Sequence, residues 1–213
     1  MSCIVCNSNQ VESFITKDEK IYWDCSNCLV KFLDKAFHID PITEKSRYLE
    51  HQNEIGDPAY LKFLSKLSEP LMAKLNSDDK GLDFGCGHGP ALAEMLKSDG
   101  YDIDLYDPFF YPNQDIFSKK YNFITCTETA EHFFNPNKEF ETLNNLLFPG
   151  GWLGIMTTFL TEDKQFENWY YRRDPTHVVF YSKKTFKIIA EQNNWQLEIP
   201  AKDIALFSKN SDT

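Results

Sequence analysis

The sequence predicts an α/β fold preceded by a small four-cysteine module, and three observations support this. Four of the six cysteines lie within the first 28 residues. Further along, short apolar segments alternate with segments of helical periodicity, which is typical of a parallel sheet covered by helices. A glycine-rich turn joins one of these strands to the next helix. We therefore expect a module at 1–36, a helical linker or cover at 37–77 and the α/β domain at 78–213.

The composition excludes several classes of protein. Of the 213 residues, 42% are hydrophobic and 15% aromatic, which is enough for a folded core and argues against disorder. No segment reaches the roughly 18 apolar residues that span a bilayer. The first residues also lack the basic and apolar regions of a secretory signal. We therefore expect a cytoplasmic protein that does not act at a membrane.

The net charge of −10, from 22 basic and 32 acidic residues, disfavours a broad nucleic-acid-binding surface. The acid excess is concentrated in 37–169, whereas 170–213 is mildly basic. The charge argument against RNA is therefore weaker at the C-terminal end than the total suggests.

The N-terminal cysteines predict a zinc site. Two Cys-x-x-Cys pairs are separated by 18 residues, and their members are Cys3, Cys6, Cys25 and Cys28. Two such pairs can surround one Zn²⁺ with four thiolates, and this site is structural because no ligand position stays open. Disulfides or free thiols are the alternatives, but a reducing cytosol disfavours disulfides. A redox role would require a βαβ context that neither pair has.

Apolar segments at 14–15, 21–23 and 30–33 predict the short strands of a zinc ribbon. A piece of 36 residues buries little core, so the metal would supply its folding energy. Two helices are predicted next, at 44–54 and 58–75. In the second, Tyr60, Leu64, Leu67, Leu71 and Leu75 recur on one face.

Residues 81–90, Gly-Leu-Asp-Phe-Gly-Cys-Gly-His-Gly-Pro, form the most informative motif. An apolar strand runs into glycines spaced Gly-x-Gly-x-Gly and then into a helix. Glycine lets the backbone approach a ligand closely and adopt positive φ, and the amide groups at a helix N-terminus are free to bind. The spacing differs from the dinucleotide-binding Gly-x-Gly-x-x-Gly.

Together with three later segments, this motif resembles the class I S-adenosylmethionine-dependent methyltransferases, which have a Rossmann-like sheet. The later segments are a strand ending in an acid at 102–107, a strand followed by a Glu-His pair at 121–133, and a Pro-Gly-Gly turn at 147–153. The resemblance covers 78–208 and implies S-adenosyl-L-methionine as cofactor. It further implies that the glycine loop wraps the methionine part and that Asp107 accepts two ribose hydroxyls. The expected cofactor-binding residues are Asp83, Gly85, Cys86, Gly87, Gly89, Asp107, Phe109, Thr127 and Glu128.

The sequence departs from the family at 108–120, where 13 residues separate Asp107 from the next strand. The family usually places a helix and a strand there, so we expect the third strand to be missing or vestigial. Phe109 is the candidate for stacking on adenine, and packing over the sheet edge is the alternative. An antiparallel hairpin at 195–199 and 204–208 is expected to close the sheet.

The substrate residues are expected in 166–181, because ligands bind outside the carboxyl ends of parallel strands. This segment is rich in aromatic residues and contains two arginines and a histidine. Arg172 or Arg173 could clamp a carboxylate or phosphate. The alternative is a lid whose arginines pair with the acidic body. The substrate-binding candidates are Tyr170, Tyr171, Arg172, Arg173 and His177.

Methyl transfer from a sulfonium is an in-line displacement, for which the protein supplies positioning and, for some acceptors, a base. The candidate bases are His132, His177 and Glu128. Glu128 and His132 would share a face if their segment were helical. The alternatives are a cofactor-side hydrogen bond for Glu128, a capping or packing role for His132 and a structural hydrogen bond for His177.

The sequence therefore predicts an S-adenosylmethionine-dependent methyltransferase that acts on a small-molecule acceptor. Some antibiotic-sugar C-methyltransferases and some ribosomal-RNA methyltransferases also join a four-cysteine module to this fold. An RNA methyltransferase that uses the zinc ribbon for RNA binding is hence the first alternative. A non-catalytic binding module with the same fold is the second. The acceptor atom (O, N or C), the base and the oligomeric state are not determined by the sequence.

Overall fold

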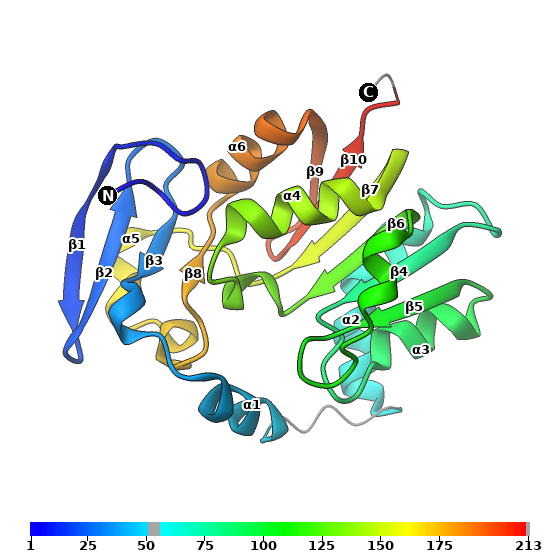
Figure 1. Cartoon of the computed structure of the whole chain (residues 1–213), viewed down its shortest axis with the longest axis horizontal. Helices are drawn as coiled ribbons and strands as arrows, with labels where there is room; N and C mark the ends of the chain where they lie inside the picture. The colour runs from blue at the N-terminus through cyan, green and yellow to red at the C-terminus, as the bar shows by residue number, and fades with distance from the viewer. Residues whose placement is uncertain (51–55, 212–213) are drawn as a thin grey trace.

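The structure is a computed structural model and describes residues 1–50 and 56–211. Its strands form a small sheet, at the left of Figure 1, and a main sheet. The small sheet has the order β1-β2-β3-β8, with bounds Val11–Lys17, Lys20–Cys25, Lys31–Leu33 and Val179–Phe180. The main sheet has the order β5-β4-β6-β7-β10-β9. Its strands are β4 (Lys80–Phe84), β5 (Asp102–Tyr106), β6 (Tyr121–Thr127), β7 (Leu147–Met156), β9 (Trp195–Ala201) and β10 (Ile204–Lys209).

The main sheet confirms the predicted Rossmann-like architecture. Strands β5, β4, β6 and β7 are parallel, and β10 and β9 form the antiparallel hairpin that closes the sheet. The reduction of the third strand is also confirmed. After β5 the chain makes only a bridge between Asp107 and Tyr111 and a 3₁₀ helix at Gln114–Ser118. Among the described residues, no strand pairs with the outer edge of β5.

Helices cover both faces of the main sheet (Figure 1). On one face lie α4 (Pro136–Leu146) and α6 (Lys183–Asn193), and on the other lie α2 (Pro58–Met72) and α3 (Ala91–Ser98). The other two described α-helices are α1 (Pro41–Leu49) and α5 (Asp163–Phe166). No helix in 1–50 or 56–211 combines the length and apolarity that crossing a membrane requires.

The helices before the main sheet begin at Asp-Pro pairs. Asp40 accepts hydrogen bonds from the amides of Ile42 and Thr43, and Asp57 accepts one from the amide of Ala59. Proline is favoured at the first helical position, so each pair is a strong start signal. The first helix therefore begins before the predicted residue 44, and the prediction for 51–54 lies outside the described residues. In α2, Leu64, Leu67 and Leu71 of the predicted face are buried, but the helix ends at Met72, so Leu75 lies beyond it and the predicted span of 58–75 is three residues too long.

The small sheet is joined to the C-terminal half of the chain. Strand β3 pairs with β8, which lies more than 140 residues later, with Phe32 opposite Val179. The hydroxyl of Thr185 also donates to the carbonyl of Cys28 (2.9 Å). The three predicted strands are present, but the fourth strand of the sheet comes from the segment expected to bind substrate. The small sheet is thus completed by residues outside the predicted module at 1–36.

Candidate cofactor and acceptor site

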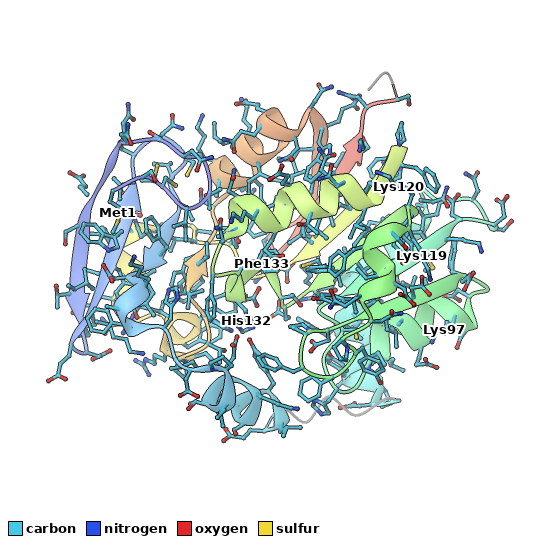
Figure 2. All side chains as sticks on the ribbon, viewed as in Figure 1. Met1, Lys97, Lys119, Lys120, His132 and Phe133 are labelled. Carbon is cyan, nitrogen blue, oxygen red and sulfur yellow. The ribbon has the colours of Figure 1, made fainter. Side chains whose placement is uncertain are left out.

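A cavity of about 1100 Å³ opens above the carboxyl ends of β4, β5 and β6. The loops after these strands form its floor. Residues of α1, the first turns of α2 and the segment 170–177 form its other walls. This edge of a parallel sheet is where α/β proteins bind ligands. Figure 2 places His132, one of the lining residues, in the middle of the molecule between the small sheet and the main sheet.

The glycine loop after β4 has the backbone geometry of a ligand cradle. Gly85 and Gly87 have φ of 78° and 63°, in the left-handed region that favours glycine. The amides of Gly85 and Cys86 both donate to the carbonyl of Tyr106, which anchors the loop to β5. A methyl group at Gly85 would lie 2.1 Å from Thr129 Cγ2, whereas one at Gly87 would meet nothing within 4 Å. The loop is therefore packed from below and open towards the cavity.

Asp107 stands at the end of β5, where the sequence placed the ribose-binding acid. Its Oδ1 accepts the amides of Phe109 (2.8 Å) and Phe110 (3.1 Å), and its Oδ2 accepts the amide of Gly87 (3.1 Å). A carboxylate offers about four acceptor positions, so one remains free on Oδ2. Asp107 therefore fixes the glycine loop and keeps acceptor capacity for a hydroxyl, and its contact with two ribose hydroxyls stays a prediction.

Other predicted cofactor residues divide into two groups. Cys86, Phe109, Thr127 and Glu128 line the cavity, and the hydroxyl of Thr127 is buried without a hydrogen-bond partner in the described chain. Gly89 does not line the cavity, and neither does Asp83. Asp83 is buried beneath the loop, where its Oδ1 accepts the Thr125 hydroxyl (2.8 Å).

The two candidate histidines lie side by side, although 45 positions separate them in the sequence. The rings of His132 and His177 are 4.9 Å apart. Nδ1 of His132 bonds to the carbonyl of Thr176 (3.0 Å), and Nδ1 of His177 bonds to the carbonyl of Tyr171 (2.7 Å). Burial lowers the pKa of His177, an effect that exceeds the raising influence of the nearby Glu131 carboxylate. The uncharged form of His177 is therefore favoured.

Glu131 completes this cluster and was not singled out by the sequence analysis. It is fully buried, and its Oε1 accepts the Tyr171 hydroxyl at 2.5 Å. The same hydroxyl bonds to Thr157 (2.9 Å), so a chain of hydrogen bonds links the carboxylate to the end of β7. The sequence signal for Glu131 was its place in the Glu-His pair. The sequence analysis selected Glu128 instead, because a helical segment would have placed Glu128 and His132 on one face.

Glu128 does not share a helical face with His132. It has φ of 47°, and only the 3₁₀ helix Ala130–His132 follows. Burial, reinforced by the charge of Glu131, raises the pKa of Glu128 to about 9. The protonated form of Glu128, which can donate a hydrogen bond, is therefore favoured, and its role as base stays a prediction.

The two adjacent arginines point to different places. Arg173 is exposed and lines the cavity, as do Tyr170 and Tyr171. Arg172 is only 5% exposed and does not line the cavity. Its guanidinium donates to the carbonyls of residues 166 and 167, to the Tyr22 hydroxyl and to Asp18. Arg172 thus ties the lid segment to the small sheet, and this corrects its predicted substrate role.

Helix α1 covers the cavity from the other side. Tyr48 packs edge-on against His132, with ring centroids 5.2 Å apart, and also contacts Phe109. Arg47 forms an ion pair with Asp174 (3.1 Å). Most of the predicted acceptor and cofactor candidates, but not Asp83, Gly89 and Arg172, therefore lie together under a helix whose lining residues the sequence analysis did not identify.

The four N-terminal cysteines form a compact buried cluster away from this cavity. Their sulfur atoms lie within 4.8 Å of one another, with Cys3 3.7 Å from Cys28 and Cys6 3.6 Å from Cys25. Four thiolates about 2.3 Å from one Zn²⁺ would be roughly 3.8 Å apart. The amides of Val5 and Cys6 point at the Cys3 sulfur, as expected for a thiolate ligand. The cluster therefore fits a tetrahedral site.

The parallel sheet, the glycine loop, the acid after β5 and the cavity above them are those of a Rossmann-like methyltransferase. A family model described as a methyltransferase domain matches residues 49–198, and the chain belongs to this family. No curated protein sequence matches the chain.

Two solved structures illustrate the fold. An O-methyltransferase family protein from Burkholderia thailandensis has a TM-score of 0.52 at 13% identity, over 84% of this chain and 64% of that one. A candidate sarcosine dimethylglycine methyltransferase from Galdieria sulphuraria has a TM-score of 0.51 at 14% identity, over 73% of this chain and 87% of that one. At these identities the likeness concerns the fold alone.

Proposed function

We propose that this chain transfers a methyl group from S-adenosyl-L-methionine to a small-molecule acceptor. The observation that carries the proposal is the pairing of an open glycine cradle with Asp107. The cradle presents Gly87 to the cavity without a side chain, and Asp107 keeps one acceptor position for a hydroxyl. The unpartnered Thr127 hydroxyl offers a further polar contact in the same cavity.

When bound, the cofactor would supply an electrophilic methyl group on a sulfonium. The residues of the chain would do the positioning. The loop 85–87 would hold the methionine part, Asp107 a ribose hydroxyl, and Phe109 the adenine from the side of α1. The walls from α1 and 170–177 would then exclude water and align the acceptor behind the methyl group, where alignment contributes about 7–11 kcal/mol to lowering the barrier.

The charge of the cavity supports a small molecule over RNA. Among the described residues, seven acidic side chains line the cavity but only two arginines, Arg47 and Arg173. Arg47 is already paired with Asp174 and Glu50. The negatively charged sugar-phosphate backbone of RNA is repelled by such a surface. Arg173 remains the candidate for an acidic group on the acceptor, with Tyr170, Tyr171 and His177 beside it.

We further propose that Cys3, Cys6, Cys25 and Cys28 bind a structural Zn²⁺. The sulfur spacing supports this, and four thiolates leave no position for a substrate. A cytoplasmic location, predicted from the sequence, would keep these thiols reduced.

Calorimetric titration with S-adenosylhomocysteine tests the cofactor assignment. We expect one binding site per chain. Asp107→Ala should weaken binding at least about tenfold, because it removes the hydroxyl acceptor and releases Gly87. Asp102→Ala is the matched control, since Asp102 lies at the exposed far end of the same strand. A wild-type chain that does not bind the ligand, or equal affinity in the two variants, would contradict the proposal.

Binding without transfer would support the non-catalytic alternative instead. Transfer of labelled methyl groups to RNA, with none to a small-molecule extract, would support the RNA alternative.

A further inference from the structure

We propose that Glu131, His132 and His177 bind one divalent transition-metal cation, which holds the acceptor through a hydroxyl oxygen. One ligand atom from each residue lies within 4.8 Å of the other two. Ligand bonds of about 2.1 Å would place these atoms roughly 3 to 3.5 Å apart, so a small side-chain movement closes the site. The site lies in the same cavity as the glycine loop. The use of the metal therefore rests on the proposed function, whereas its binding does not.

Hydrogen bonds to backbone carbonyls prepare both histidines for a metal. A carbonyl can only accept, so Nδ1 of His132 must donate to Thr176 and Nδ1 of His177 must donate to Tyr171. Each neutral ring then keeps its lone pair on Nε2. This arrangement, with one nitrogen fixed by a carbonyl and the other unprotonated, is the usual state of a metal-binding histidine.

The carboxylate supplies an independent observation. Glu131 is 0% exposed, and its Oε2 has no hydrogen-bond partner among the residues that the structure describes. Its Oε1 is fixed by the Tyr171 hydroxyl. A buried carboxylate oxygen without a partner is costly, and a cation bound through Oε2 would satisfy it. Two imidazoles and one carboxylate with open positions suit Mn²⁺, Fe²⁺, Co²⁺ or Zn²⁺.

The ion would select an oxygen nucleophile. An amine nitrogen bound to a metal has no lone pair left for the methyl group, whereas a hydroxyl oxygen keeps one. Coordination also lowers the pKa of the hydroxyl, which then loses its proton to water. The oxygen forms a bond to the methyl carbon as the carbon–sulfur bond breaks and its electron pair stays on sulfur. The products are a methyl ether, a thioether and one proton.

Manganese titration followed by the electron paramagnetic resonance of free Mn²⁺ tests the site. This hard cation does not compete for the four-thiolate cluster. We expect one bound Mn²⁺ per chain, and at least about tenfold weaker binding in His132→Asn, His177→Asn and Glu131→Gln. Asparagine keeps the donor to the backbone carbonyl and removes Nε2, and glutamine keeps an acceptor for Tyr171.

His38→Gln is the matched control. This histidine also bonds to a carbonyl, that of Leu33, but lies outside the cluster. Its Mn²⁺ affinity should equal that of the wild type. Wild-type protein that does not bind Mn²⁺, or equal binding in the control and the three cluster variants, would overturn the proposal.

Proton nuclear magnetic resonance of the wild-type protein tests the same site if a variant does not fold. Bound Mn²⁺ should broaden the proton signals of the His132 and His177 rings before those of His38 and His88, and the opposite order would also overturn the site. S-Adenosylhomocysteine titration of the same samples separates the two proposals. If the protein binds S-adenosylhomocysteine but does not bind Mn²⁺, only the metal site is refuted. If the protein does not bind S-adenosylhomocysteine, the cofactor assignment is refuted.

Discussion

Asp83 carries a carboxyl group whose environment favours the neutral form. It is 3% exposed and lies beneath the glycine loop. Burial raises its pKa to about 6, the hydrogen bond from Thr125 opposes this shift, and the charge of Asp107 adds to it. The pKa of Asp83 in the folded state exceeds the ordinary value of 3.8. The protonated carboxyl group therefore makes its full contribution to the stability of the fold below about pH 4. That contribution is lost as the pH rises through about 6.

We therefore predict that Asp83→Asn is more stable than the wild type at neutral pH. Asparagine keeps an acceptor for the Thr125 hydroxyl and carries no charge. The gain in unfolding free energy should grow from about pH 4 to pH 6.5 and then level off at roughly 3 kcal/mol. Urea unfolding at several pH values measures it. Asp102→Asn, at an exposed position, is the control, and a gain that is independent of pH would contradict the argument.

The residues that could be predicted from sequence are those whose chemistry is local. Gly85 and Gly87 were identified because a turn between a strand and a helix needs positive φ, and Asp107 because the family that the sequence resembles has an acid at the end of the next strand. Glu131 was missed for the opposite reason. Its role depends on His177 and Tyr171, which reach it only through the packing of distant segments.

At the scale of elements, the strand β8 and the 3₁₀ helix Tyr170–Arg173 hold the lid against the small sheet. Most strands and helices were predictable, since each has its own periodicity and end signals. The pairing of β3 with β8 was not, because a two-residue strand has no periodicity and its partner is remote in sequence.

We predict that substitution of Arg172 destabilises the fold and that substitution of the adjacent Arg173 does not. Arg172→Met should lower the unfolding free energy by roughly 2 to 4 kcal/mol. The substitution leaves two carbonyls and the Tyr22 hydroxyl without the hydrogen bonds that the guanidinium now donates. Arg173→Met should change it by less than about 0.5 kcal/mol, because the side chain is exposed. Guanidinium unfolding of both variants compares them. Equal stability would show that Arg172 does not anchor the lid.

At the scale of the whole molecule, the cysteine cluster and the main sheet share one apolar core. Buried residues run from Cys3 and Cys28 through Phe180 to Phe207 on β10. Gln192 of α6 also donates to the carbonyl of Cys6 (3.2 Å). The cysteine module is therefore expected to unfold together with the methyltransferase domain, and not as a separate unit.

Metal removal tests this coupling. Chelation under reducing conditions, or Cys28→Ser, should lower the melting temperature of the entire chain by about 10 °C or more. The reason is that the free energy of metal binding stabilises the folded state, since the unfolded chain has no preformed site. Loss of the small sheet would also release β8 and the lid, so the affinity for S-adenosylhomocysteine should fall in parallel. Ser26→Ala is the control, since this exposed side chain lies between Cys25 and Cys28 but offers no metal ligand, so the zinc content and the affinity should stay unchanged. A melt in which the main transition keeps its temperature while a small early transition appears would show that the two parts fold independently.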